Sequence, residues 1–355
     1  MHDRAYTGRP LPAPWRKVLP ETAITLVKDI HRFQSARKAR DVLYGPWLER
    51  PPQFVWQRHE LYHSAGLRLA QLLSRPFVLS VHSLAVREAH SWGVRRPGWT
   101  RLAEWLGETR IMQKADLLAC VSNEVAERVQ ELGIAPERIV VTPNGVDLEH
   151  FRPDIDGASV RLELGLQDRF VVGWSGSFRA FHGLDTALHA VATLQRKGSR
   201  ISLLLVGDGL GRPHIERLAR ELKITDIRFT GAVPYEQMPR YIAAMDVALT
   251  LARPGEVFHY SPVKLREYMA CGRPVIANPA GEIGRIMTDG EDALLPPSGD
   301  HAALAHAIEA LMLDSQLAES LGTAALSHVR RVGSWSAQVR VVLSALRRLG
   351  HEVAA

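Results

Sequence analysis

Two side chains three positions apart could bind a diphosphate and a pair of neighbouring hydroxyls from one helix. Lys264 offers a cation for phosphate oxygens, and Glu267 offers a carboxylate that accepts hydrogen bonds. Residues three apart share a helix face, and Ser261 followed by Pro262 has the residue types of a helix N-terminus. The alternative is a surface Lys–Glu pair, which contributes roughly 0.3 kcal/mol and needs no ligand.

Two glycine-containing segments could also bind phosphate. In residues 173–183, Gly176 would allow close backbone approach and Arg179 offers a fork of donors, although a plain loop with an exposed arginine explains the segment equally well. Residues 207–211 suggest a dinucleotide fingerprint. Arg212 stands where Gly-x-Gly-x-x-Gly needs its third glycine, which argues against a nicotinamide site.

A parallel sheet must position these segments, because ligands of open α/β sheets bind where strands end and helices begin. Short apolar runs alternate with helical patterns, the order expected of βαβ units and an α/β fold. The expected strands are residues 54–56, 77–81, 117–121, 139–142, 170–174, 201–206, 227–229, 247–251 and 274–277.

The length of 355 residues favours two domains. Turn-forming residues place the break near residue 152, so residues 153–335 form a complete Rossmann-like domain and residues 336–355 a C-terminal helix. Residues 1–152 offer only four strands and a helical pattern over 22–43. This first domain is expected to be incomplete, since no glycine-rich loop follows an early strand.

The composition narrows the class of protein. Hydrophobic residues make up 46% and charged residues 23%, without a signal-peptide core or a long apolar stretch, so a cytoplasmic protein is expected. Cys120 and Cys271 lie in apolar runs typical of buried thiols, and the 15 histidines show no metal-binding spacing. The charge of +6 suits phosphorylated small molecules or an anionic membrane as partners. A nucleic-acid partner is not expected, because the sequence has neither an RNA-binding signature nor a basic-aromatic stripe.

Together these segments resemble family 4 of the glycosyltransferases, which have the GT-B fold. The family signature is a glutamate pair followed by Met-Ala-x-Gly-x-Pro-Val, and Glu267 with residues 269–275 matches its second half. Val121-Ser122 and residues 143–147 match further motifs, in the family's order. The resemblance implies two Rossmann-like domains facing across a cleft, with the nucleotide sugar held by the second. It also implies transfer with retention of configuration, usually without a metal, and no cofactor.

The resemblance assigns roles in the second domain. Glu267 would bind the ribose hydroxyls, Arg179 and Lys264 would hold the diphosphate and act in catalysis, and Val233 would contact the base. Gly176 and Ser261 complete the binding residues. Preorganised cations of this kind contribute about 3 kcal/mol each to catalysis.

In the first domain, His82 and Glu88 resemble the strand and loop that face the transferred sugar. Both are candidate catalytic residues, although a histidine after a strand is more often structural. Two departures affect the donor site: His259 replaces the first glutamate of the pair, with Glu256 one turn away, and His182 replaces the lysine of a Lys-Gly pair. His182 and His259 are retained as candidate binding residues.

The sequence therefore predicts a retaining glycosyltransferase that uses a UDP-sugar, with a GDP-sugar second, and an unidentified acceptor. A lipid-borne acceptor would place it at the inner face of the membrane, and the basic surface suits that location. The alternative is a non-catalytic nucleotide-sugar-binding subunit whose first domain is completed by a partner chain. A sugar-nucleotide epimerase is disfavoured because the sequence offers no evident acid-base carboxylates.

Overall fold

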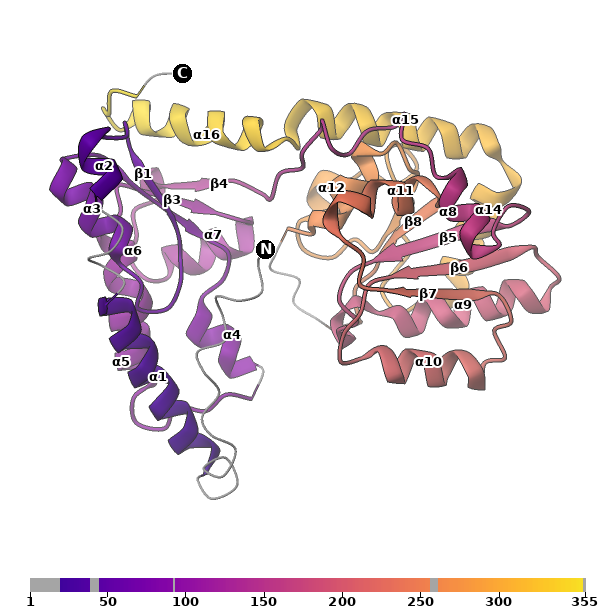
Figure 1. The fold of residues 1–355 in the computed structure, drawn as a ribbon, viewed down its shortest axis with the longest axis horizontal. Coiled ribbons are helices and arrows are strands. Elements are labelled where there is room, and N and C mark those ends of the chain that lie inside the picture. Colours follow the sequence, from indigo (N-terminus) through magenta and orange to yellow (C-terminus); the bar gives the residue numbers. More distant parts are fainter. Residues whose placement is uncertain (1–19, 39–44, 92, 256–260, 354–355) are drawn as a thin grey trace. The chain divides into compact units, whose positions relative to one another are not determined.

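The computed structural model describes residues 20–38, 45–91, 93–255 and 261–353. Their contacts divide the chain into two compact units, residues 1–142 with 340–355 and residues 143–339. Each unit is built around its own parallel sheet with helices packed against it (Figure 1). The predicted α/β class is confirmed in both units.

The first unit contains a parallel sheet with the strand order β1-β2-β3-β4. Alternate residues of its strands point to opposite faces, which gives the sheet two apolar layers. Phe77 and Leu79 pack on one face, whereas Val78 packs on the other with Val342 and Leu346 near the C-terminus. The strands are β1 Val55–Arg58, β2 Phe77–Val81, β3 Leu117–Cys120 and β4 Ile139–Val141.

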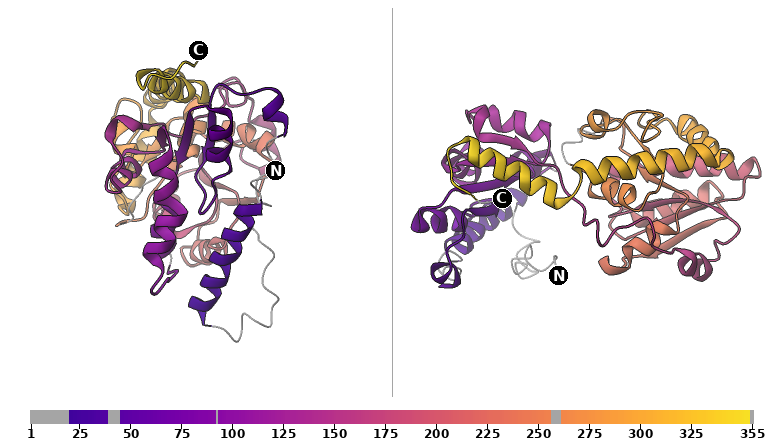
Figure 2. Two further views of the ribbon diagram at one scale, coloured as in Figure 1. Left: turned by 90° about the vertical axis from the view of Figure 1, so that its left-hand side faces the viewer. Right: turned by 90° about the horizontal axis from the view of Figure 1, so that it is seen from above.

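The helices of the first unit connect and cover these strands (Figure 2). They are α1 Glu21–Lys38, α2 Gly45–Glu49, α3 Ala65–Leu73, α4 Ala85–Ser91, α5 Thr100–Glu104, the π-turn η2 Trp105–Thr109, α6 Arg110–Lys114, α7 Asn123–Gln130, the 3₁₀ turn η3 Pro136–Arg138 and most of α16 Trp335–Arg348. Ser122 caps α7 by accepting the N–H of Val125 at 3.3 Å, as its position before the helix predicts.

The second unit has five parallel strands in the order β7-β6-β5-β8-β9. The chain runs from β5 outward to β7 and then returns to the other side of β5, so the order reverses between β5 and β8. Ligands of such sheets bind beyond the strand ends at this reversal. The strands are β5 Phe170–Ser175, β6 Ile201–Val206, β7 Ile227–Gly231, β8 Val247–Thr250 and β9 Val275–Ala277.

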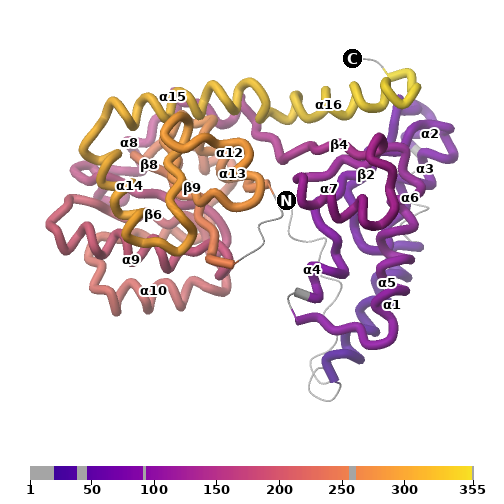
Figure 3. The backbone as a smooth tube through the Cα atoms, turned by 180° about the vertical axis from the view of Figure 1, so that it is seen from behind, coloured from indigo at the N-terminus to yellow at the C-terminus, as the bar shows by residue number. Residues whose placement is uncertain are grey.

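Helices cover both faces of the second sheet (Figure 3). One apolar layer contains Leu188 of α9 and Ile308 of α14, and the other contains Ile242 of α11, Leu265 of α12 and Val329 of α15. The helical elements are α8 Ala158–Leu164, η4 Ala180–His182, α9 Leu184–Arg196, α10 Arg212–Glu221, η5 Tyr235–Gln237, α11 Met238–Ala243, α12 Val263–Ala270, α13 Ile283–Ile286, α14 His301–Leu313 and α15 Ser315–Val332.

The boundary between the units differs from the one expected at residue 152, because it falls between Thr142 and Pro143. The turn that follows is tied to the second unit: Asn144 Nδ2 donates to the carbonyl of Ser261 at 2.7 Å, and Val146 N donates to that of Gly333 at 2.9 Å. The expected separate C-terminal helix also differs, since residues from Arg340 onward belong to the first unit.

Two further observations concern the cysteines and the apolar character of the helices. Cys120 and Cys271 are free and buried, as their apolar surroundings predict. Among the helices within the described residues, none has the length and apolar character needed to cross a bilayer.

Candidate functional site

Helix α12 is fixed against the end of β5 by a buried tyrosine. The hydroxyl of Tyr268 accepts the N–H of Ser175 at 2.7 Å and lies 2.9 Å from the Ser175 Oγ. Tyr268 is fully buried, so these contacts are not exchanged with water. This connection places the helix that carries Lys264 and Glu267 beside the loop that follows β5.

Lys264 reaches into that loop without finding a hydrogen-bond partner. Its Nζ lies 4.2 Å from the centre of the Trp174 ring and is shielded from solvent, and no described residue accepts a hydrogen bond from it. Burial lowers the pKa of Lys264 to about 7, and only nearby Glu267 opposes this shift. An ammonium buried in this way is costly unless a ligand accepts its hydrogen bonds.

The alternative interpretation, that Lys264 and Glu267 form an ordinary surface ion pair, is wrong. Within the described part of the chain they form no ion pair, and the Lys264 Nζ is buried rather than exposed. Burial also raises the pKa of Glu267 to about 7, against the influence first of Lys264 and then of His150. Both groups can therefore change charge near neutral pH.

Gly176 lies directly against the ammonium. Its φ of +143° is a conformation that side chains disfavour, and a Cβ at this position would lie 2.8 Å from the Lys264 Nζ. Any larger residue would therefore push the lysine away. Because Gly176 has no side chain, its backbone can lie directly beside the Lys264 ammonium.

The second glycine-rich segment packs against the first instead of forming a dinucleotide loop. A Cβ on Gly207 would lie 2.0 Å from the carbonyl oxygen of Gly176, and a Cβ on Gly211 would lie 2.2 Å from that of Phe178. The N–H of Gly211 donates to the same Phe178 carbonyl at 2.8 Å. These glycines let the loops after β5 and β6 lie together, which shapes the loop next to Lys264.

The arginine and histidine of the β5 loop have different surroundings. Arg179 is exposed, whereas His182 is buried with its ring 5.4 Å from that of Trp174. Burial, followed by Lys264 and Arg179, lowers the pKa of His182 to about 2. His182 is therefore neutral and cannot supply the positive charge of the lysine it replaces, which leaves the cations Arg179 and Lys264.

An aromatic pair borders Glu267, and sequence reasoning missed it. The rings of His150 and Tyr235 stack 4.7 Å apart at 25°, and the His150 Nε2 lies 3.1 Å from the Tyr235 carbonyl oxygen. Asp147 Oδ1 accepts the N–H of His150 at 3.2 Å and so orients this segment. The aspartate in the turn was the available signal, because Asp commonly hydrogen-bonds the backbone two or three residues later.

Trp174 is the other missed residue. Its ring contacts Lys264, His182 and Phe178, and it is fully buried. Trp174 and Gly176 are two positions apart at the end of a strand, a spacing that places residues on the same face. That spacing could have indicated that the indole and the glycine share one environment.

Ser261 does not cap α12, contrary to the sequence prediction. The helix begins at Val263, and the Ser261 Oγ instead accepts from Arg266 Nη1 at 2.5 Å and from the Asn144 N–H at 3.3 Å. Arg266 also pairs with buried Glu282 at 2.6 Å. The serine is occupied by this buried network, which fixes the chain just before α12.

Val233 and His259 are the remaining predicted residues of the second unit. Val233 is partly buried and packs against the apolar layer below the loop that follows β7. His259 lies outside the described residues. The structure thus brings Gly176, His182 and Lys264 together around Trp174, with Glu267 on the same helix as the lysine.

In the first unit, His82 and Glu88 follow β2. His82 is partly exposed, and burial lowers its pKa to about 4, with Arg58 and His59 acting in the same direction. Glu88 accepts a hydrogen bond from the Ser83 hydroxyl. A neutral histidine that follows a strand can exchange hydrogen bonds with sugar hydroxyls, so both residues stay candidate acceptor-side groups.

Comparison with known proteins gives matches along most of the chain. The family model described as Glycosyltransferase Family 4 matches residues 20–150, and that described as Glycosyl transferases group 1 matches residues 169–314. A D-inositol 3-phosphate glycosyltransferase of Streptomyces bingchenggensis is 30% identical over 305 residues, which cover 81% of this chain and 66% of that protein. One of Frankia alni is 31% identical and covers 86% and 77%.

Solved structures agree on the fold. The crystal structure of HepE from Anabaena in complex with UDP matches with a TM-score of 0.66 and 20% identity, covering 80% of this chain and 75% of that one.

The match spans 66% of the length of the Streptomyces relative, just under two thirds, and 77% of the length of the Frankia relative. With motifs, fold and relatives in agreement, the chain belongs to the group 1, family 4 glycosyltransferases, enzymes of the GT-B fold.

Proposed function

We propose that this chain transfers a sugar from a nucleoside-diphosphate sugar, with retention of configuration and without a bound cofactor. The observation that carries the proposal is the Lys264 ammonium, which is buried beside Gly176 and has no hydrogen-bond partner among the described residues. A diphosphate would supply the missing acceptors. Arg179 would then share the charge of the leaving diphosphate as the bond to the sugar breaks.

Glu267 would accept hydrogen bonds from the ribose hydroxyls, with Val233 at the base and the His150–Tyr235 pair beside the carboxylate. UDP is the first nucleotide to test, since HepE was crystallised with UDP. GDP is second. The names of the relatives support a phosphorylated polyol such as an inositol phosphate as the first acceptor to test.

Thermal stabilisation by a series of nucleoside diphosphates tests the donor site. UDP should raise the melting temperature of the wild-type protein, and Lys264→Ala and Glu267→Ala should each reduce that rise. Equal stabilisation of both variants and the wild type would refute the site.

Turnover tests the activity separately. Wild-type protein with a UDP-sugar and an inositol phosphate should release UDP and form a glycoside with the donor's anomeric configuration. An inverted product would contradict retention. Nucleotide binding without turnover across acceptors would favour the partner-subunit alternative. We also propose that His82 and Glu88 act on the acceptor side. A partner chain and a location at the inner face of the membrane stay proposals as well.

A further inference from the structure

The segment that follows β2 carries both acceptor-side candidates, and buried apolar side chains anchor it at two points. Leu84 packs in an apolar layer of the first sheet, whereas Val86 packs in a separate cluster of three buried residues. His82 and Glu88, which lie on either side of these anchors in the sequence, are partly exposed. Their arrangement therefore depends on what fixes the backbone at the start of α4.

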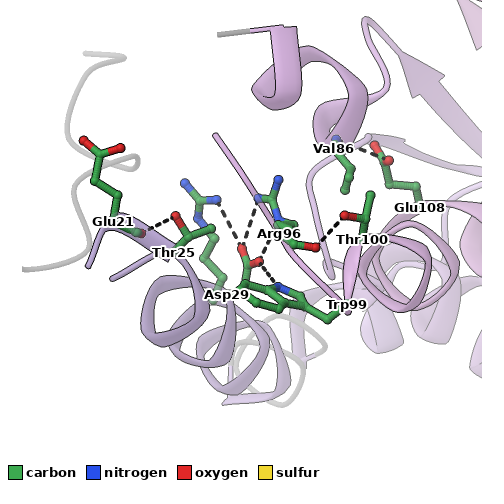
Figure 4. Close-up of polar contacts among 9 residues, drawn as sticks. Glu21, Thr25, Asp29, Val86, Arg96, Trp99, Thr100 and Glu108 are labelled. Atoms are coloured by element: carbon green, nitrogen blue, oxygen red, sulfur yellow. Dashed lines mark hydrogen bonds and ion pairs between the residues drawn. The ribbon is translucent and has the colours of Figure 1, made fainter. Parts of the chain in front are cut away.

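A buried carboxylate binds the backbone at this point. Glu108 accepts the N–H of Ala85 through Oε1 and the N–H of Val86 through Oε2, the latter at 3.3 Å (Figure 4). Ala85 and Val86 are the first two residues of α4, whose N–H groups have no partner within the helix. Hydrogen bonds to a charged acceptor are roughly twice as strong as neutral ones, and Glu108 is only 2% exposed to competing water. The Glu108 carboxylate thus holds the start of α4.

The chain around Glu108 keeps the carboxylate in place. Glu108 lies in the π-turn η2, and single π-turns within helices often occur at functional sites. A Cβ on Gly107 would lie 2.4 Å from Leu61 Cδ1, and the Gly107 carbonyl accepts the N–H of Tyr62 at 3.2 Å. Tyr62 has a φ of +72°, a conformation that a bulky residue keeps only where the surrounding structure requires it. The turn after β1 and the π-turn therefore fix each other.

A histidine links the same carboxylate to the ends of β1 and β2. His59 Nε2 lies 3.3 Å from Glu108 Oε1, and the His59 N–H donates to the carbonyl of Ser80 at 2.7 Å. The His59 ring is buried, and its Nδ1 has no hydrogen-bond partner among the described residues. Burial, followed by Arg58 and His59, lowers the pKa of His82, so His59 also lies near that candidate. Glu108 therefore joins the strand end before His82 to the helix that carries Glu88.

We propose that Glu108, held by His59, is a positioning residue for sugar transfer, because it fixes the start of α4 and so keeps His82 and Glu88 in one arrangement. Its buried carboxylate acts through this segment and not by contact with a substrate. A displacement of about 1 Å in a reacting group can cost roughly a hundredfold in rate. The inference rests on the proposed acceptor roles of His82 and Glu88, and it uses none of the donor-binding residues.

Hydrogen exchange tests whether Glu108 holds the segment. Glu108→Gln keeps the size of the side chain but replaces one acceptor oxygen by an NH2 group. The amides of residues 83–90 should then exchange at least about tenfold faster than in the wild type. Val342→Ala, which shortens a buried side chain on the opposite face of the same sheet, is the matched control and should leave this exchange unchanged. Equal exchange in Glu108→Gln and the wild type would overturn the proposal.

Transfer from a UDP-sugar to D-inositol 3-phosphate tests the functional half. Glu108→Gln should lower kcat by roughly tenfold to a hundredfold, whereas UDP should raise its melting temperature as much as that of the wild type. Val342→Ala should keep the wild-type rate. In a His82→Ala background, Glu108→Gln should cost less than about threefold more, because a residue that acts through His82 has little left to disturb.

The possible results separate the two proposals. Losses from His82→Ala and Glu108→Gln that multiply in the double variant would show that Glu108 only supports the fold, and would overturn its positioning role. An unchanged kcat in Glu108→Gln would do the same. A wild-type protein without turnover would refute the proposed function, and the exchange experiment would then decide by itself whether Glu108 fixes the segment.

Discussion

The Nζ of Lys264 lies 4.2 Å from the centre of the Trp174 ring and is shielded from solvent there. An aromatic face attracts a cation electrostatically, but it replaces only part of the hydration that an ammonium loses on burial. The lysine is therefore held ready for a ligand at a cost to the stability of the free protein.

The affinity for UDP should decrease as the pH rises above about 7. Lys264 has a pKa of about 7 in the free protein and loses its charge above that pH, whereas a bound diphosphate would restore the charge. Binding should then take up as much as one proton, and affinity should fall by up to about tenfold per pH unit. Calorimetry in two buffers of different ionisation enthalpy measures the uptake. Lys264→Met should bind weakly without it, and proton-independent binding by the wild type would contradict the prediction.

Replacing Lys264 by methionine should stabilise the free protein at neutral pH. The folded-state pKa, about 7, lies below the ordinary 10.5, so between these values the unfolded chain holds a proton that the folded chain has lost. The resulting penalty grows as the pH falls from 10.5 to 7 and is constant below 7. Lys264→Met should thus raise the free energy of unfolding by about 0.5–2 kcal/mol at pH 7, with a smaller gain near pH 10.

Denaturant unfolding at the two pH values measures this effect. Lys223→Met changes an exposed lysine of the same unit and should leave stability within about 0.5 kcal/mol of the wild type. Destabilisation by Lys264→Met at neutral pH would mean that the contact of the ammonium with Trp174 outweighs its lost hydration.

Gly176→Ala should weaken UDP binding by roughly tenfold, because the added Cβ would displace the Lys264 Nζ that lies 2.8 Å from its position. Gly198→Ala is the matched control: Gly198 has a φ of +87°, but an added Cβ would meet no atom within 4 Å. Both substitutions place an alanine at a positive φ, so the control shows what backbone strain alone does to UDP binding. Equal loss of binding in both variants would show that strain, not displacement of the lysine, is responsible.

Arg179→Ala should reduce kcat by roughly a hundredfold while changing the affinity for UDP less, because the guanidinium would act mainly on charge that develops as the diphosphate leaves. Arg179→Lys should restore part of the rate, since an ammonium keeps the charge but loses the paired donors. Arg200→Ala, an exposed arginine of the same unit, serves as the control. A rise in KM alone would assign Arg179 to ground-state binding instead.

In the first unit, Arg96→Leu should destabilise the protein by about 3–5 kcal/mol, because it removes the buried arginine that pairs with the buried Asp29 carboxylate at 2.7 Å and leaves only half-exposed Arg32, at 3.9 Å, as an ion-pair partner. The double variant Asp29→Leu/Arg96→Leu should recover much of that loss. Arg87→Ala, which breaks an exposed pair with Glu131, should cost less than about 1 kcal/mol. Differential scanning calorimetry compares the three, and an Arg96→Leu cost as small as that of Arg87→Ala would contradict the prediction.

The strands, the parallel class and the family could all be predicted from the order of the amino acids. Apolar runs such as residues 201–206 are local signals, because burial of both faces of a strand leaves its mark on consecutive residues. The motif around Glu267 is equally local, since it occupies one helix and the turn after it. For the same reason the expected strand ends agree with the observed ones to within about two residues.

The contacts between distant side chains could not be predicted from the sequence and depend on how the chain folds. Tyr268 contacts Ser175, Ser261 contacts Asn144, and Lys264 lies on Trp174 although these partners are distant in the chain. Helical periodicity predicts α1 but does not reveal that Asp29 is buried in the folded chain, because that depends on Arg96 reaching Asp29. Local patterns record how each residue is buried, whereas its partner is set by how the elements pack.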